Sequence, residues 1–209
     1  MRVTKFGHSC LHVTEGSASI LLDPGAFSSG FESLTGLTAV LLTHQHFDHV
    51  DADKLVTLLA ANPGASVHAD AQTAAILSEK GIEVTTVQAA DEFDVGVPVS
   101  VYGARHAVIH KDIPVISNVA YLIDGRLLHP GDSFTEIDRP VEILALPVSA
   151  PWMAVKEAVE YVRSVSPAYV IPIHEQVLSR PAMVYGMVEP LLPKSSRWVL
   201  MDDGQTREF

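Results

Sequence analysis

Cysteines, basic residues and long apolar runs are scarce or absent in the sequence, and each absence excludes a class of protein. It has a single cysteine, so it forms no internal disulfide, and the strand-like surroundings of Cys10 indicate a buried, unreactive thiol. Basic residues are scarce: 14 Lys and Arg face 25 Asp and Glu, and the net charge of −11 argues against nucleic acid and anionic membranes as partners. No apolar run reaches the roughly 18 residues that a membrane span requires.

What is present is typical of a globular protein, with 47% hydrophobic and 19% charged residues. The length of 209 residues predicts a single domain over residues 1–209. The chain enters a strand pattern directly, with no secretory signal ahead of it, so we expect a cytoplasmic protein. The composition leaves a homo-oligomer open.

Apolar patterns predict strands and helices in two runs, each of strands followed by helices. Asp124-Gly125 between two apolar segments is a strong hairpin signal, and Pro151 suits the first turn of a helix. Strands are expected at 2–6, 10–14, 18–22, 39–43, 65–69, 82–87, 97–104, 118–123, 126–129, 142–146, 169–173 and 198–201, and helices at 53–61, 71–80, 151–165 and 181–192. This order predicts an α/β protein with layered sheets and not a single parallel sheet.

The densest chemistry lies in residues 43–51, between an apolar strand and the start of a helix. Imidazole and carboxylate are ligands that suit zinc, iron or manganese. His44 and His46 are two apart and can point to one side, whereas the adjacent Asp48 and His49 need not join them. The spacing therefore indicates two neighbouring ions, held on what we expect to be a surface turn.

The pattern His-x-His-x-Asp-His resembles the signature of the metallo-β-lactamase superfamily. Gly7-His8-Ser9 and Asp23-Pro24 look most like its L-ascorbate-6-phosphate lactonase branch. The resemblance implies an αββα sandwich, in which two mixed sheets pack together with helices on the outer faces. It also implies three further ligands at strand ends, and the chain offers one at each place. By this pattern metal one takes His44, His46 and His106, metal two takes Asp48, His49 and His174, and Asp132 bridges them.

The resemblance implies a dinuclear metallohydrolase that cleaves an ester, lactone, amide or phosphoester of a small, anionic substrate with a metal-bridged hydroxide. Asp132 and Asp48 would act as catalytic residues that orient the nucleophile, and Ser133 would cap or orient Asp132. The cofactors would be two divalent ions, zinc first and manganese or iron as alternatives. Two other readings stay open: an iron-dependent oxidoreductase of the same fold, similar to persulfide dioxygenases, and a non-catalytic metal-binding protein. The sequence after His174 has no familiar substrate motif, so the substrate does not carry over.

Several residues outside the ligand set are candidates for supporting roles. His8 and His110 are candidate substrate contacts, each with a structural role as the alternative. Asp23 and Asp51 could hold ligand imidazoles from behind, or could form a turn and cap a helix, respectively. The loop 26–36 either covers a pocket or is an ordinary surface excursion.

Overall fold

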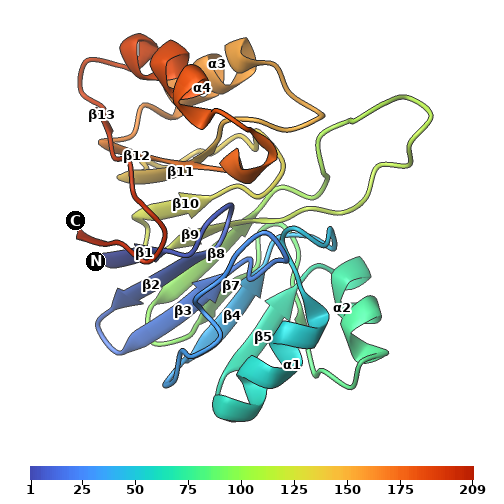
Figure 1. The fold of residues 1–209 in the computed structure, drawn as a ribbon. Coiled ribbons are helices and arrows are strands. Elements are labelled where there is room, and N and C mark those ends of the chain that lie inside the picture. Colours follow the sequence, from blue (N-terminus) through green and yellow to red (C-terminus); the bar gives the residue numbers. More distant parts are fainter.

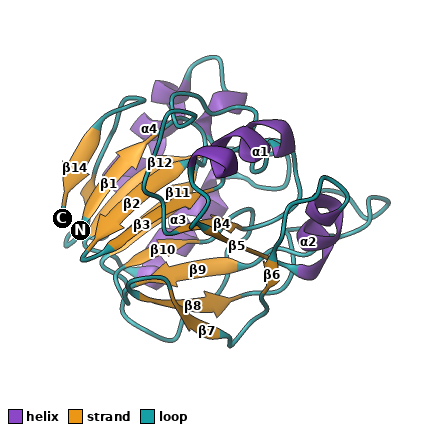
Figure 2. Ribbon diagram, turned by 90° about the horizontal axis from the view of Figure 1, so that it is seen from below, coloured by secondary structure: helices purple, strands orange, loops and turns teal.

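The computed structural model describes residues 1–209 and consists of two seven-stranded mixed sheets packed face to face (Figures 1 and 2). The first sheet has the order β14-β1-β2-β3-β4-β5-β6, and the second has the order β13-β12-β11-β10-β9-β8-β7. The strands of the first sheet are β1 (Arg2–Lys5), β2 (Leu11–Glu15), β3 (Ala18–Leu22), β4 (Ala39–Leu42), β5 (Ser66–Ala69), β6 (Thr85–Thr86) and β14 (Thr206–Glu208). Those of the second are β7 (Glu92–Asp94), β8 (Pro98–Tyr102), β9 (Ala120–Ile123), β10 (Leu127–His129), β11 (Ile143–Pro147), β12 (Tyr169–Ile173) and β13 (Arg197–Trp198).

Helices cover the outer face of each sheet, which confirms the predicted αββα sandwich (Figure 1). The first sheet is covered by α1 (Ala52–Ala61) and α2 (Ala71–Ser78), and the second by α3 (Val155–Val165) and α4 (Pro181–Val188). Two short 3₁₀ turns follow β12 and α4, at Glu175–Val177 and Glu189–Leu191. None of the helices has the length and apolar character needed to cross a membrane.

The alternation of side chains along the strands explains the three layers of the core. In β4, Ala39 and Leu41 face the other sheet, while Val40 and Leu42 pack under α1 and α2. In β11, Ile143 likewise joins the cluster between the sheets, and its neighbour on the opposite face packs under α3. Strands that are buried on both faces read as continuous apolar runs, which is why these segments carry no polar positions.

Parallel strands position the site at one edge of the sandwich. β3, β4 and β5 run parallel in the first sheet, and β10, β11 and β12 run parallel in the second. The carboxyl ends of β3, β4, β10 and β12 therefore deliver Asp23, His44, Asp132 and His174, each within three residues of its strand. The sheets are tied together beside these residues, because the Tyr121 hydroxyl on β9 donates to the carbonyl of Leu42.

The largest differences from the sequence-based expectation concern four elements. The third helix begins at Val155 and not at Pro151, and the last helix ends at Val188 before a 3₁₀ turn. The expected strand at 82–87 is reduced to two residues, Thr85–Thr86, and the expected strand at 198–201 is Arg197–Trp198. Strands β7 and β14 were not expected, since both are short and polar. β14 pairs antiparallel with β1, so the two termini lie side by side (Figures 1 and 2).

Candidate metal centre

The turn after β4 is organised by the carboxylate of Asp23 at the end of β3. Asp23 accepts hydrogen bonds from the Thr43 backbone N–H over 2.8 Å and from the Thr43 hydroxyl over 2.7 Å. It also lies 2.7 Å from His49 Nδ1, so a single buried carboxylate fixes both ends of the ligand turn. Asp51 instead caps α1 by accepting from the N–H groups of Asp53 and Lys54, which is the helix-capping alternative of the two considered for it.

The first cluster gathers residues from three separate segments. The ligand atoms of its members all lie within 4.8 Å of one another, and the members are His44, His46, His106 and Asp132. His44 Nε2 and His46 Nδ1 are 3.1 Å apart. His44 was expected on a surface turn, and this expectation is wrong: the residue is fully buried, because the ring of His106 packs against it at 5.0 Å and the ring of His49 at 4.1 Å.

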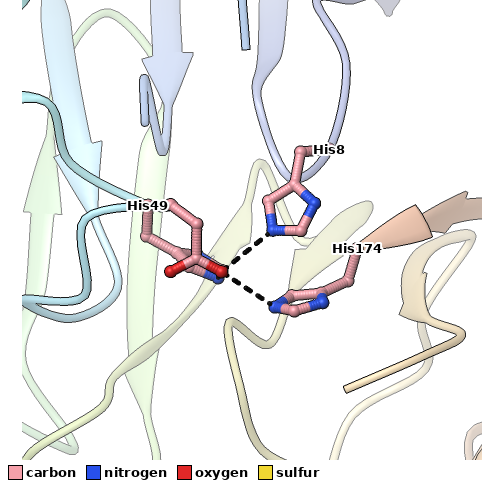
Figure 3. Close-up of side chains that lie close together, drawn as sticks. His8, His49 and His174 are labelled. Carbon is pink, nitrogen blue, oxygen red and sulfur yellow. Dashed lines mark hydrogen bonds and ion pairs between the residues drawn. The ribbon is translucent and has the colours of Figure 1, made fainter. Parts of the chain in front are cut away.

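The second cluster lies beside the first and contains a residue that the metal pattern did not include. Its members, again within 4.8 Å, are His8, Asp48, His49 and His174. Asp48 Oδ2 is 3.4 Å from His174 Nε2 and 3.1 Å from His8 Nε2 (Figure 3). The backbone of His174 is itself left-handed, with φ of 66°, where β12 turns into the following 3₁₀ segment.

Asp132 lies between the two clusters. Its Oδ1 is 3.1 Å from His49 Nε2, and its Oδ2 is 3.2 Å from His174 Nε2 and 3.4 Å from His106 Nε2. The turn that carries it is held by Asn118, whose side chain accepts from the Asp132 N–H and donates to the Pro130 carbonyl. One carboxylate therefore reaches ligand atoms of both clusters.

Besides Nδ1 of His8, four buried polar atoms in these clusters have no hydrogen-bond partner, namely His49 Nε2, His106 Nε2, His174 Nε2 and Asp132 Oδ1. The other ring nitrogen of each of these histidines is occupied: Nδ1 of His49 by Asp23, Nδ1 of His106 by the Ala107 carbonyl at 2.6 Å, and Nδ1 of His174 by the Ser149 carbonyl at 2.6 Å. In the neutral ring, a protonated Nδ1 leaves a lone pair on Nε2, so these nitrogens and the Asp132 oxygen converge on one another as potential ligand atoms. This donor set fits divalent cations, which need neutral imidazoles held from behind.

The charges of the site have clear physical causes. Burial lowers the pKa of His44 well below its usual value, and the nearby His49 lowers it further. For His174, burial works against the charged form, but Asp132 and Asp48 outweigh it and raise the pKa to about 9. The pKa of Asp132 is held well below its usual value, because the surrounding imidazoles outweigh the cost of burial. Hydrogen bonds from His174 and His8 outweigh burial in the same way and hold the pKa of Asp48 below its usual value, so both carboxylates of the centre are ionised at neutral pH.

Trp152 was not anticipated from the sequence, although it contacts the centre directly. Its indole Nε1–H donates to Asp132 Oδ2 over 2.8 Å. No spacing rule joins residues 132 and 152, so only the fold could show this contact. Ser133, expected to orient Asp132, does not touch it; its hydroxyl bonds the Pro130 carbonyl and Thr135.

The remaining candidates fall at different distances from the centre. His8 is fully buried inside the second cluster, whereas the side chain of His110 is 57% exposed on the loop that extends from the body after β8 (Figure 1). Their roles as substrate contacts stay predictions. The loop 26–36 is divided: Phe31 is buried in the core, and Phe27 packs edge-on against the rings of His8 and Phe47 at 5.3 and 5.2 Å. Cys10 is fully buried, as expected.

Comparison with known families decides the assignment, because the β-lactamase superfamily domain matches residues 2–174. The chain belongs to the metallo-β-lactamase superfamily. The match covers every residue of both clusters, from His8 to His174. The likeness to the L-ascorbate-6-phosphate lactonase branch stays a prediction.

Two sequence relatives and one solved structure are similar to most or all of this chain. Protein Rv0786c of Mycobacterium tuberculosis is 47% identical over 185 residues, which cover 86% of each chain. The UPF0173 metal-dependent hydrolase PF1764 of Pyrococcus furiosus is 27% identical and covers 100% of both chains. Among solved structures, the metallo hydrolase Igni18 of Ignicoccus hospitalis shares the fold with a TM-score of 0.76 at 22% identity, covering 100% of this chain and 98% of the other.

Proposed function

We propose that this protein is a dinuclear metal-dependent hydrolase acting on a small, anionic substrate. The observation that carries the proposal is the position of Asp132, whose two oxygens reach ligand atoms of both clusters at 3.1–3.4 Å. A bridging carboxylate is needed only where two ions share a site. Relatives such as the metal-dependent hydrolase PF1764 of Pyrococcus furiosus, which is similar to this chain over its whole length, support the hydrolase class.

The residues of the centre would divide the work as follows. His44, His46 and His106 would hold one ion, while Asp48, His49 and His174 would hold the second. When bound, such ions supply a water-derived nucleophile at neutral pH and polarise the oxygen of the scissile group. Zinc suits imidazole-rich sites of this kind, and manganese and iron use the same ligand types.

The charge of the centre favours an anionic group on the substrate. Two divalent ions held by Asp48 and Asp132 would leave a positive centre at the edge of an otherwise acidic protein of net charge −11. The same acidic surface disfavours long polyanions such as nucleic acid, because their charge extends well beyond the centre. A small phosphoester, or a small ester, lactone or amide that also carries an anionic group, meets both conditions.

Side-chain nucleophiles fit the site poorly. Burial raises the pKa of the Cys10 thiol well above its usual value, so the reactive thiolate is suppressed. The Ser133 hydroxyl is occupied by the Pro130 carbonyl and Thr135, and no histidine lies within hydrogen-bond distance of it. Neither group has the adjacent base that activates a nucleophile.

Metal analysis of the reconstituted protein tests the proposal. We expect two divalent ions per chain in the wild type and one in His174→Ala, because His174 belongs to the second cluster alone. A panel of generic carboxylic esters and phosphodiesters should show turnover that chelation abolishes and added zinc or manganese restores. Binding of a single ion, or turnover that survives chelation, would overturn the assignment. Iron as the native ion, with consumption of dioxygen, would favour the oxidoreductase alternative.

A further inference from the structure

His8 projects from a turn whose backbone is held at each carbonyl. The Gly7 carbonyl accepts from the Cys10 N–H and from the Ser28 hydroxyl at 2.9 Å, and the Ser9 carbonyl lies 2.8 Å from Nε2 of His129. The His8 carbonyl accepts from the His174 N–H over 3.2 Å, so the turn is fastened directly to the second cluster.

The backbone of His8 is in the left-handed region, with φ of 50°. A non-glycine residue in this region carries strain, and such strain persists where the surrounding structure over-determines the conformation, most often at functional sites. The conformation aims the imidazole into the second cluster (Figure 3). There the ring is fully buried between His174, at 4.1 Å between ring centroids, and Phe27, at 5.3 Å.

Hydrogen-bond directions separate His8 from the ligand histidines. In His49, His106 and His174, Nδ1 has a fixed partner and Nε2 is unpaired, so the neutral ring has a lone pair facing the centre. His8 shows the reverse arrangement: Nε2 has a partner in Asp48 Oδ2 at 3.1 Å, and Nδ1 is buried without one.

The unpaired Nδ1 decides which tautomer suits this position. If His8 bound an ion through Nε2, its proton would lie on Nδ1, where it would be a buried donor with no acceptor. Orphaned buried N–H groups are rarer than unpaired acceptors. With the proton on Nε2, the ring instead donates to an ionised carboxylate, which is among the stronger hydrogen bonds in proteins.

We propose that His8 is a positioning residue whose Nε2–H donates to Asp48 Oδ2 and holds that carboxylate in place for the second ion, without binding the ion itself. The role rests on the proposed two-ion centre. The buried environment formed by Phe27 and His174 keeps water from competing for the bond. The geometry thus mirrors the usual arrangement in which a carboxylate orients a ligand histidine.

Two variants of His8 separate donation from mere packing. His8→Gln keeps an N–H donor near the position of Nε2, and His8→Leu removes it; both place a non-glycine residue in the same left-handed backbone. We expect cobalt titration, followed by visible absorption, to show the second ion bound 10–100-fold more weakly in His8→Leu. His8→Gln should recover most of that loss, and the first ion should bind equally in all three proteins.

Ser28→Ala is the control for the turn, because it removes a hydrogen bond to the Gly7 carbonyl without touching Asp48. It should leave the affinity for the second ion unchanged, and an effect as large as that of His8→Leu would reduce His8 to a structural role. If the wild type binds two ions and His8→Leu binds the second ion with the same affinity, this inference alone is overturned. A wild type that binds a single ion would overturn it together with the proposed function.

Nitrogen NMR of zinc-loaded protein with labelled histidine reads the tautomer directly. We expect His8 to carry its proton on Nε2, while His49, His106 and His174 carry theirs on Nδ1. A metal-bound Nε2 in His8, with the proton on Nδ1, would make it a ligand and overturn the proposal.

Discussion

The indole N–H of Trp152 lies 2.8 Å from Oδ2 of Asp132, the carboxylate oxygen that also faces His106 and His174. Trp152 is half-buried, and its ring packs edge-on to Phe134 at 5.1 Å, so its direction is fixed by packing. A donor aimed at this oxygen limits the rotation of the carboxylate between the two clusters. It thereby helps to set the spacing of the two proposed sites.

Replacing Trp152 with Phe should therefore weaken metal binding. The variant keeps an aromatic ring but loses the donor, and the loss of such an outer partner typically costs 10–100-fold in metal affinity. Competition with a chromophoric chelator measures the change for each ion. Trp198→Phe is the matched control, since the Trp198 indole N–H has no partner and belongs to the packing under α4. Equal affinities in the two variants would show that the indole hydrogen bond has no role.

The two candidate supporting carboxylates should respond differently to substitution. Asp23→Asn would place an amide N–H opposite either the Thr43 N–H or His49 Nδ1, both of which need an acceptor. If it faces His49, the ring must carry its proton on Nε2, and a protonated Nε2 cannot bind an ion. We expect the second ion to bind at least about tenfold more weakly.

Asp51→Ala provides the contrast in the same turn. It removes the cap of α1, so the free energy of unfolding should fall by about 1 kcal/mol while the affinity for both ions stays unchanged. Chemical denaturation and metal titration of the two variants measure both quantities. A larger loss of metal affinity in Asp51→Ala than in Asp23→Asn would contradict the roles assigned here.

Gly25 is a further determinant of the ligand turn. A Cβ at this position would overlap the backbone carbonyl of Asp48, so Gly25→Ala must displace the Asp48–His49 peptide. We expect the second ion to be lost and the melting temperature of the metal-free protein to drop. Gly64→Ala is the control, because a Cβ there meets nothing within 4 Å. A Gly25→Ala variant with normal stoichiometry would show that the turn tolerates the shift.

The metal-ligand residues could be predicted from the sequence because the ends of strands can be recognised in it. Apolar runs predict β4, β10 and β12, and ligand-type residues follow each run directly. The order of parallel strands then brings those ends together at one edge. The structure places the seven expected residues in two clusters, although the chemistry that they perform stays a proposal.

Contacts that depend on side-chain direction were not accessible in this way. The sequence predicts a helix start at Pro151-Trp152, yet α3 begins at Val155, because the Glu157 side chain accepts from the Ala154 N–H at 2.6 Å. Trp152 therefore lies outside the helix, and its side chain contacts the site. The hydrogen-bond arrangement of the His8 ring nitrogens depends on a left-handed backbone conformation, and no periodicity in the sequence predicts that conformation. Residues that act through one hydrogen bond across the fold leave no local signal.

Metal binding should release protons, because neighbouring carboxylates favour the charged form of two second-cluster histidines in the metal-free protein. Despite burial, Asp132 and Asp23 raise the pKa of His49 well above its usual value, and Asp132 and Asp48 raise that of His174 to about 9. Ligand histidines must be neutral, so filling the second site at pH 7 should release about two protons. Calorimetry in buffers of different ionisation enthalpy counts them.

The sign of the pH dependence follows from the same two groups. A pKa raised from 6.5 to about 9 for His174 means that the folded metal-free protein holds a proton that the unfolded chain gives up. This contribution to the stability of the metal-free protein is complete below pH 6.5 and is lost as the pH rises through about 9. Metal affinity should increase over the same interval, because a smaller fraction of the His174 rings carries a proton that the ion must displace. Melting temperatures of chelated and metal-loaded protein should therefore diverge between pH 7 and 9. His174→Ala should shrink the divergence, and parallel curves in the wild type would show that these histidines are neutral before the ions bind.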